Sequence, residues 1–106
     1  MLRIAAAFLA TASFAAFAAE GDINVTIENH RFTPDRIEVP AGKKVKLVID
    51  NRDATAEEFE SHALKIEKVI PAKSKGTVLV GPLKPGEYKF VGEFNEKTAK
   101  GLIVAK

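Results

Sequence analysis

Short runs of alternating apolar and polar residues follow one another along the chain from Asp22 onwards. An alternation with a period of two predicts β-strands that bury one face. The expected strands lie at 23–27, 37–39, 45–49, 64–70, 78–80, 88–90 and 102–104, and turn-forming Pro, Gly, Asn and Asp residues separate most of them. No segment carries a long helical repeat. The pattern therefore predicts an all-β fold, a single Greek-key sandwich of about seven or eight strands.

Two segments break this alternation. The stretch from Asn51 to Ser61 is the longest polar run, and Thr55 before Glu57 and Glu58 favours a short helix there, because a hydroxyl ahead of early acidic residues suits a helix N-terminus. The segment 32–35 contains Phe-Thr-Pro-Asp, which predicts a turn.

The beginning of the chain has the features of a secretory signal peptide. A short positive start is followed by an apolar run at 4–17 and by Ala16-Phe17-Ala18, whose small residues suit a signal peptidase. The apolar run is shorter than the ~20 residues that a membrane-spanning helix needs. We therefore predict a signal peptide at 1–18 and one periplasmic domain at 19–106 that is not inserted in the membrane.

Composition excludes several kinds of chemistry. The chain has no Cys, and its single Met is Met1, within the predicted signal peptide, so a thiol nucleophile and sulfur ligands to a metal are excluded from the mature domain. Sixteen basic and 14 acidic residues leave no basic excess that would indicate nucleic acid binding. No Gly-rich phosphate loop is present, and no nucleophile lies beside a base in a catalytic arrangement.

The side chains that remain favour a metal ion. His62 and Glu58 lie in the polar stretch and just after it, and Glu93 and Glu96 precede the last expected strand. One imidazole with several carboxylates can hold Fe, Mn, Zn or Cu(II), so we predict a metal site at His62, Glu58, Glu93 and Glu96. The alternative is that His62 is a hydrogen-bonded residue at a strand start and that the acids are solvated charges.

Three further acidic or imidazole residues are not expected to bind metal. Glu57 and Glu60 are expected to be solvated loop charges, and His30, at the end of the first strand, is expected to be structural.

Three segments, 32–42, 46–53 and 82–104, together resemble the cupredoxins, small secreted β-sandwiches that hold one copper ion. In that family the last segment carries a Cys, a His and a Met that ligate copper. Gly92 stands at the place of the Cys, Asn95 or a neighbour at that of the His, and Ala99 at that of the Met, and His62 falls where the resemblance implies the first His ligand. The resemblance thus implies the fold, whereas the missing ligands argue against a blue-copper (type 1) site.

The segments 51–53, 57–62 and 92–101 are similar to the EfeO-type cupredoxin-like domain, a branch found with bacterial iron-uptake systems, as are small periplasmic partners of iron permeases. This resemblance implies an iron or copper ion, and a role in iron uptake or in ferrous iron oxidation or transfer. It also implies an iron permease or another periplasmic iron-uptake component as the partner. We expect a binding protein rather than an enzyme, with ferrous oxidation as an accessory role. The alternative is an adaptor that docks on a permease without metal.

Overall fold

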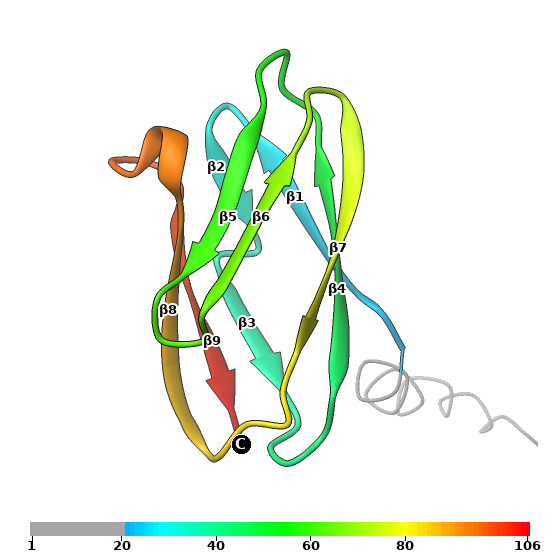
Figure 1. Cartoon of the computed structure of the whole chain (residues 1–106), viewed down its shortest axis with the longest axis vertical. Coiled ribbons are helices and arrows are strands. Elements are labelled where there is room, and N and C mark those ends of the chain that lie inside the picture. Colours follow the sequence, from blue (N-terminus) through cyan, green and yellow to red (C-terminus); the bar gives the residue numbers. More distant parts are fainter. Residues whose placement is uncertain (1–20) are drawn as a thin grey trace, which may run out of the picture.

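The computed structural model describes residues 21–106, so the predicted signal peptide lies outside the described residues. The described part contains nine strands and one short 3-10 helix, η2 (Figure 1). Their bounds are β1 Ile23–Glu28, β2 Arg31–Thr33, β3 Arg36–Val39, β4 Val45–Asn51, β5 Glu57–Ser61, β6 Ile66–Ile70, β7 Ser74–Val80, β8 Gly86–Gly92, η2 Glu93–Asn95 and β9 Lys100–Ala105.

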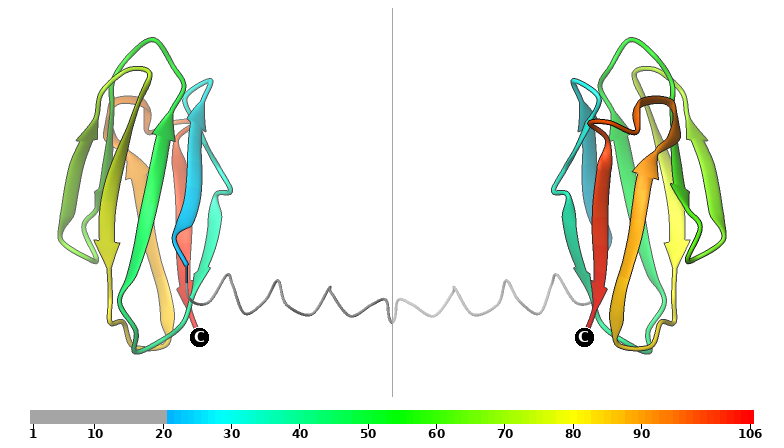
Figure 2. Two further views of the ribbon diagram at one scale, coloured as in Figure 1. Left: turned by 90° about the vertical axis from the view of Figure 1, so that its right-hand side faces the viewer. Right: turned by 90° about the vertical axis from the view of Figure 1, so that its left-hand side faces the viewer.

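The strands form two sheets that pack face to face, as the side views in Figure 2 show. One sheet has the order β2-β1-β4-β7, and the other has the order β3-β9-β8-β5-β6. The pairs β1–β4 and β3–β9 are parallel, and the remaining pairs are antiparallel. The predicted all-β sandwich is confirmed.

Apolar side chains from both sheets fill the space between them. Leu47 and Ile49 of β4 face Phe59 of β5 and Phe90 of β8, and all four side chains are buried. The ring centroids of Phe32 and Phe90 lie 4.9 Å apart in an edge-to-face arrangement, and those of Phe59 and Phe90 lie 4.9 Å apart in a stacked one. Without a disulfide in the chain, this burial is the main stabilising term of the fold.

Two local predictions were wrong. The expected turn at 32–35 begins as strand β2, whose Phe32 is buried in the core. The expected helix through Glu57 and Glu58 is the strand β5, which pairs with both β6 and β8.

The polar residues of β5 explain why alternation did not reveal it. The inward-facing residues Glu57 and Ser61 are polar, and only Phe59 between them is apolar. The Ser61 hydroxyl donates a hydrogen bond to the carbonyl oxygen of Lys89 at 2.7 Å, so this buried polar group has a partner. A strand whose inward side chains are hydrogen-bonded polar groups carries little apolar periodicity.

Candidate functional site

One end of the sandwich, uppermost in Figure 1, gathers the β1–β2 turn, the β4–β5 loop and η2, and we call it the upper pole. Asn51 organises the loop from inside. Its buried side-chain amide donates hydrogen bonds to the carbonyl oxygens of Thr55 and Ile70, both at 3.0 Å. These bonds hold the β4–β5 loop against the end of β6.

Asp53 fixes the neighbouring turn. Its carboxylate accepts hydrogen bonds from the backbone N–H groups of Asn29 at 2.8 Å and His30 at 2.9 Å, two residues with positive φ. Burial opposes ionisation of Asp53, but these backbone donors outweigh it and hold the pKa of Asp53 below its usual value. His30 therefore belongs to a structural turn, in agreement with its expected role.

Glu57, Gly92, Asn95 and Ala99 converge beneath the upper pole. A Cβ atom built on Gly92 would lie 2.6 Å from Cδ of Glu57 and 2.7 Å from Cβ of Ala99. These distances are shorter than van der Waals contact, so Gly92 leaves the room that the Glu57 side chain occupies. A side chain at position 92 requires Glu57 to move.

The Glu57 carboxylate is fully engaged in this place. The residue is 2% exposed. Its Oε1 accepts hydrogen bonds from the N–H groups of Phe94 at 2.8 Å and Glu58 at 2.9 Å, and its Oε2 accepts one from Nδ2 of Asn95 at 2.8 Å. The expectation of a solvated loop charge at Glu57 was wrong, because three donors compensate its burial.

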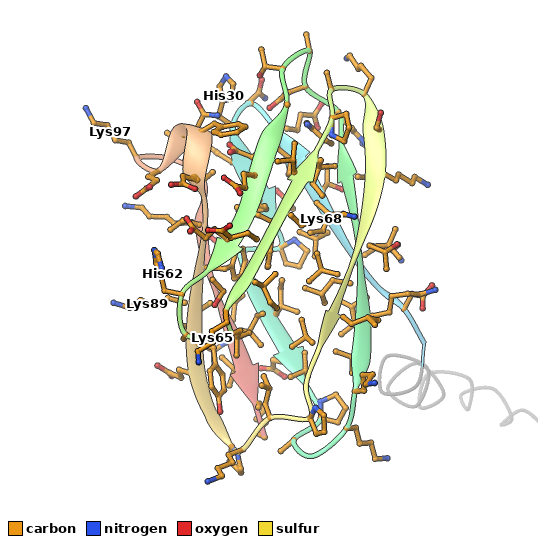
Figure 3. The ribbon with its side chains drawn as sticks, in the orientation of Figure 1. His30, His62, Lys65, Lys68, Lys89 and Lys97 are labelled. Atoms are coloured by element: carbon orange, nitrogen blue, oxygen red, sulfur yellow. The ribbon has the colours of Figure 1, made fainter. Side chains whose placement is uncertain are left out.

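This arrangement does not fit the copper ion that the cupredoxin resemblance implies. Gly92 and Ala99 offer no donor atom, and the Asn95 amide is turned toward Glu57. The residue that meets Gly92 is Glu57, whereas His62 follows the far end of β5 and has a side chain that is 89% exposed. Figure 3 shows His62 well below His30, beside Lys89 and away from the upper pole.

A second group of polar side chains lies on the outer face of the five-stranded sheet. It consists of Glu58 and Glu60 of β5, Glu67 of β6 and Glu93 just after β8, and we call it the acidic cluster. The strand register pairs Glu60 with Glu67 and pairs Phe59 with Gly92, which places Glu58 beside Glu93. Pairing of the strands thus brings together acids from three separate parts of the chain.

The acidic cluster contains two carboxyl groups, those of Glu58 and Glu60, whose pKa values are raised. Loss of solvation, hydrogen bonds with Glu67 and Glu93, and the negative charge of Glu93 raise the pKa of Glu60 to about 7. A hydrogen bond with Glu93, together with loss of solvation and neighbouring acids, also raises the pKa of Glu58. Like-charged neighbours and poor solvation therefore oppose full ionisation of the cluster.

The predicted ligands separate into two groups. Glu58 and Glu93 lie next to one another, and Nε2 of His62 lies 3.8 Å from Oε2 of Glu60, so these three residues share one face of the sheet. Glu96 is exposed at the end of η2, and in the described part of the chain no hydrogen bond or ion pair links it to the acidic cluster.

Sequence reasoning missed Glu60 and Glu67 as members of this group. The expectation that Glu60 is a solvated loop charge was wrong, because it lies in β5 and is 4% exposed. Recognition of the hairpin formed by 57–61 and 66–70 would have predicted the Glu60–Glu67 pair. Within residues 21–106, no three histidine or acidic side chains surround a common point, so the cluster is not a preformed metal centre.

We expect Glu60→Gln to raise the melting temperature of the metal-free protein by several degrees at about pH 8 and to change it less near pH 5. In the folded state the pKa of Glu60 is raised to about 7, whereas the usual pKa of a Glu side chain is 4.5. Protonation of Glu60 therefore makes its full contribution to the free energy of unfolding below pH 4.5, and this contribution is lost as the pH rises through about 7. Thermal unfolding followed by circular dichroism against pH measures the effect. Glu87→Gln on the exposed part of β8 is the control, and identical profiles for the wild type and Glu60→Gln would contradict the prediction.

A family model described as the cupredoxin-like domain matches residues 1–105. The chain therefore belongs to the cupredoxin-like domain family. Protein RP394 of Rickettsia prowazekii (strain Madrid E), described as uncharacterized, is 42% identical over 83 residues, which are 78% of this chain and 66% of that protein. The chain thus spans slightly less than two thirds of the length of this relative.

Solved structures show the same fold. The metal-binding domain of the Cu(I)-exporting P-type ATPase CopA of Streptococcus pneumoniae D39 has a TM-score of 0.71 at 16% identity, with 80% of this chain and 84% of that chain covered. Auracyanin A, a blue copper protein from Chloroflexus aurantiacus, has a TM-score of 0.68 at 12% identity, with 80% and 98% covered. Likeness at such identities establishes the architecture alone. In the described part of the chain, no helix is long and apolar enough to cross a membrane.

Proposed function

We propose that this protein is a periplasmic metal-handling component of bacterial iron uptake. It binds a metal ion on the outer face of the five-stranded sheet and assists the transfer of ferrous iron to a permease or another uptake component. The ion is cargo in this proposal. The proposal does not use the place beneath the upper pole, because the side chain of Glu57 fills it and three hydrogen-bond donors engage the Glu57 carboxylate.

The observation that carries this proposal is the position of Glu60. Its carboxyl group contacts Glu93 and lies 3.8 Å from His62, so it connects predicted ligands that are far apart in the sequence. Glu58 joins the same group through Glu93. Carboxylates and an imidazole at one surface are ligands that iron and other first-row divalent metals accept. The resemblance of 57–62 and 92–101 to the EfeO-type domain supports iron as the cargo.

Titration calorimetry tests this proposal. We expect the purified, exported protein to bind Fe(II) under anaerobic conditions, or Cu(II), with a micromolar or lower Kd. We expect the Glu60→Gln, Glu93→Gln double variant to bind at least about tenfold more weakly, a loss of about 1.4 kcal/mol. Glu87→Gln, an exposed acid of the same sheet, is the control for general charge. Absence of binding of both ions by the folded protein would contradict the proposal.

An adaptor without metal is the second candidate, and Phe94 is the observation that favours it. Its side chain is exposed on η2 at 54%, although its backbone N–H is bound to Glu57. A large exposed apolar side chain is a common feature of protein contact surfaces. Metal-independent binding to an iron permease that Phe94→Ala abolishes and Glu60→Gln leaves unchanged would favour the adaptor.

A further inference from the structure

The outer face of the five-stranded sheet carries two groups of opposite charge. One is the acidic cluster. The other consists of Arg36 of β3, Lys89 of β8 and Lys100 of β9, which are all exposed, and we call it the basic group. Leu102 of β9 lies between Arg36 and Lys89 in the strand register. None of the ion pairs within residues 21–106 joins the basic group to the acidic cluster, so both groups remain open to a partner.

Apolar surface lies between the two groups. Val91 faces outward from β8, and its register partners are Lys100 of the basic group and Glu60 of the acidic cluster. Two hollows of about 490 and 480 Å³ border on Val91, one lined in part by the basic group and Asp35, the other in part by Glu60. Most of the surface that lines both hollows is apolar. An apolar centre with charged groups around it is the usual anatomy of a protein contact surface.

The two groups make this face complementary to itself. In a two-fold symmetric pair every contact occurs twice, with the two residues exchanged between the copies. Neighbouring strands lie about 4.8 Å apart, and outward residues of one strand lie about 6.8 Å apart. On this grid Val91 is midway between the two groups, and a two-fold axis through Val91, parallel to the sheet, brings Lys89 of one copy over Glu67 of the other. A partner of a single charge would match only half of the face, whereas a second copy matches both groups.

We propose that the outer face of the five-stranded sheet joins two copies of this protein in a symmetric dimer, with Val91 at the axis and the acidic cluster of each copy against the basic group of the other. The five strands have four to seven residues each. The face therefore measures roughly 20 Å by 20 Å, which is less than the ~800 Å² per partner of a standard interface. We expect a weak dimer that salt dissociates, because screening weakens the contacts between charges.

The dimer contact uses acids of the proposed metal site, but it does not depend on the proposed function. A metal ion would neutralise the acidic cluster and compete with the basic group of the second copy. The dimer is therefore expected in metal-free protein, and EDTA is present throughout its test. Failure of the dimer then leaves the metal-handling function standing, and absence of metal binding leaves the dimer standing.

Sedimentation equilibrium of the exported protein at rising concentration, in low and in high salt, measures the dimer. We expect Lys89→Glu and Glu67→Lys each to weaken self-association at least about tenfold, because each brings like charges together twice. An equimolar mixture of the two variants is expected to associate like the wild type, since both contacts then join opposite charges. Lys75→Glu makes the same charge change on the outer face of the other sheet and is the control. All three residues are exposed, so the variants are expected to fold, and circular dichroism checks that they do.

The mixture is the decisive measurement, because a change within one copy cannot restore association when two weakened variants are combined. A mixture that associates no better than its two components would overturn the dimer. A wild type that stays monomeric at every concentration in low salt would also overturn it. So would an equal loss of association in Lys75→Glu and Lys89→Glu, which would show an effect of net charge rather than of this face.

Discussion

Glu57→Ala is expected to lower the free energy of unfolding by about 3–5 kcal/mol. The substitution removes the acceptor of three hydrogen bonds and leaves the N–H groups of Phe94 and Glu58 and the Asn95 amide without it. It also opens a cavity beside Gly92 and Ala99. Urea denaturation followed by circular dichroism measures the loss. A small domain has about 5–15 kcal/mol of stability in total, so the expected change is a large part of it.

Two companion variants show whether the hydrogen bonds or the charge of Glu57 carry this effect. Glu57→Gln retains an oxygen for Phe94 and Glu58, and the Asn95 amide can turn over to present its oxygen to the new NH₂ group. We therefore expect Glu57→Gln to cost less than about half as much as Glu57→Ala. Glu96→Ala, an exposed acid at the same pole, is expected to change stability by less than about 0.5 kcal/mol. A Glu57→Ala variant as stable as Glu96→Ala would contradict this account of the upper pole.

Phe90→Ala is expected to cost about 3–5 kcal/mol of unfolding free energy. The side chain is 1% exposed and contacts both Phe32 and Phe59 at centroid distances of 4.9 Å. A Cβ atom built on Gly101, the residue paired with Phe90 on β9, would overlap the Phe90 ring, so the ring lies directly against Gly101. Its removal leaves a cavity at the centre of the sandwich that rigid strands on both sides cannot close.

Phe94→Ala is the matched control for Phe90→Ala because it removes the same side chain from an exposed position. We expect this control to change the free energy of unfolding by less than about 1 kcal/mol. Denaturant titrations of both variants give the comparison directly. A loss for Phe90→Ala no larger than that for Phe94→Ala would show that the aromatic group does not stabilise the core.

The fold was predictable because most strands carry a simple alternation. In β4, Val45, Leu47 and Ile49 are inward and buried, whereas Lys46 is exposed, and such a pattern permits one arrangement of the strand against a core. β5 was not predictable in this way, because Glu57 and Ser61 occupy inward positions. Their burial depends on donors and acceptors in β8 and η2, which the local sequence of β5 does not contain.

The candidate site was likewise predictable only in part from the sequence. The sequence indicated carboxylates and a histidine as the available ligands, and it contains no Cys or Met within residues 21–106. It did not indicate that the side chain of Glu57, rather than that of His62, meets Gly92. The antiparallel register of β5 with β8 pairs Phe59 with Gly92, and the Glu57 side chain, two residues earlier on the same inward face, reaches Gly92. Nor did the sequence indicate that Glu60 is buried beside Glu67.

The sequence by itself therefore determined the all-β class, the core faces of the regular strands and the chemical types of ligand available. Only the tertiary structure decided which acids are interior hydrogen-bond acceptors and which form the acidic cluster. The physical reason is that the alternation of apolar and polar residues is a local property of the sequence, whereas residues on other strands set the solvation and the hydrogen-bond partners of a carboxylate. Glu57 and Glu60 lie on one strand, and their surroundings differ because one faces the core and the other faces outward.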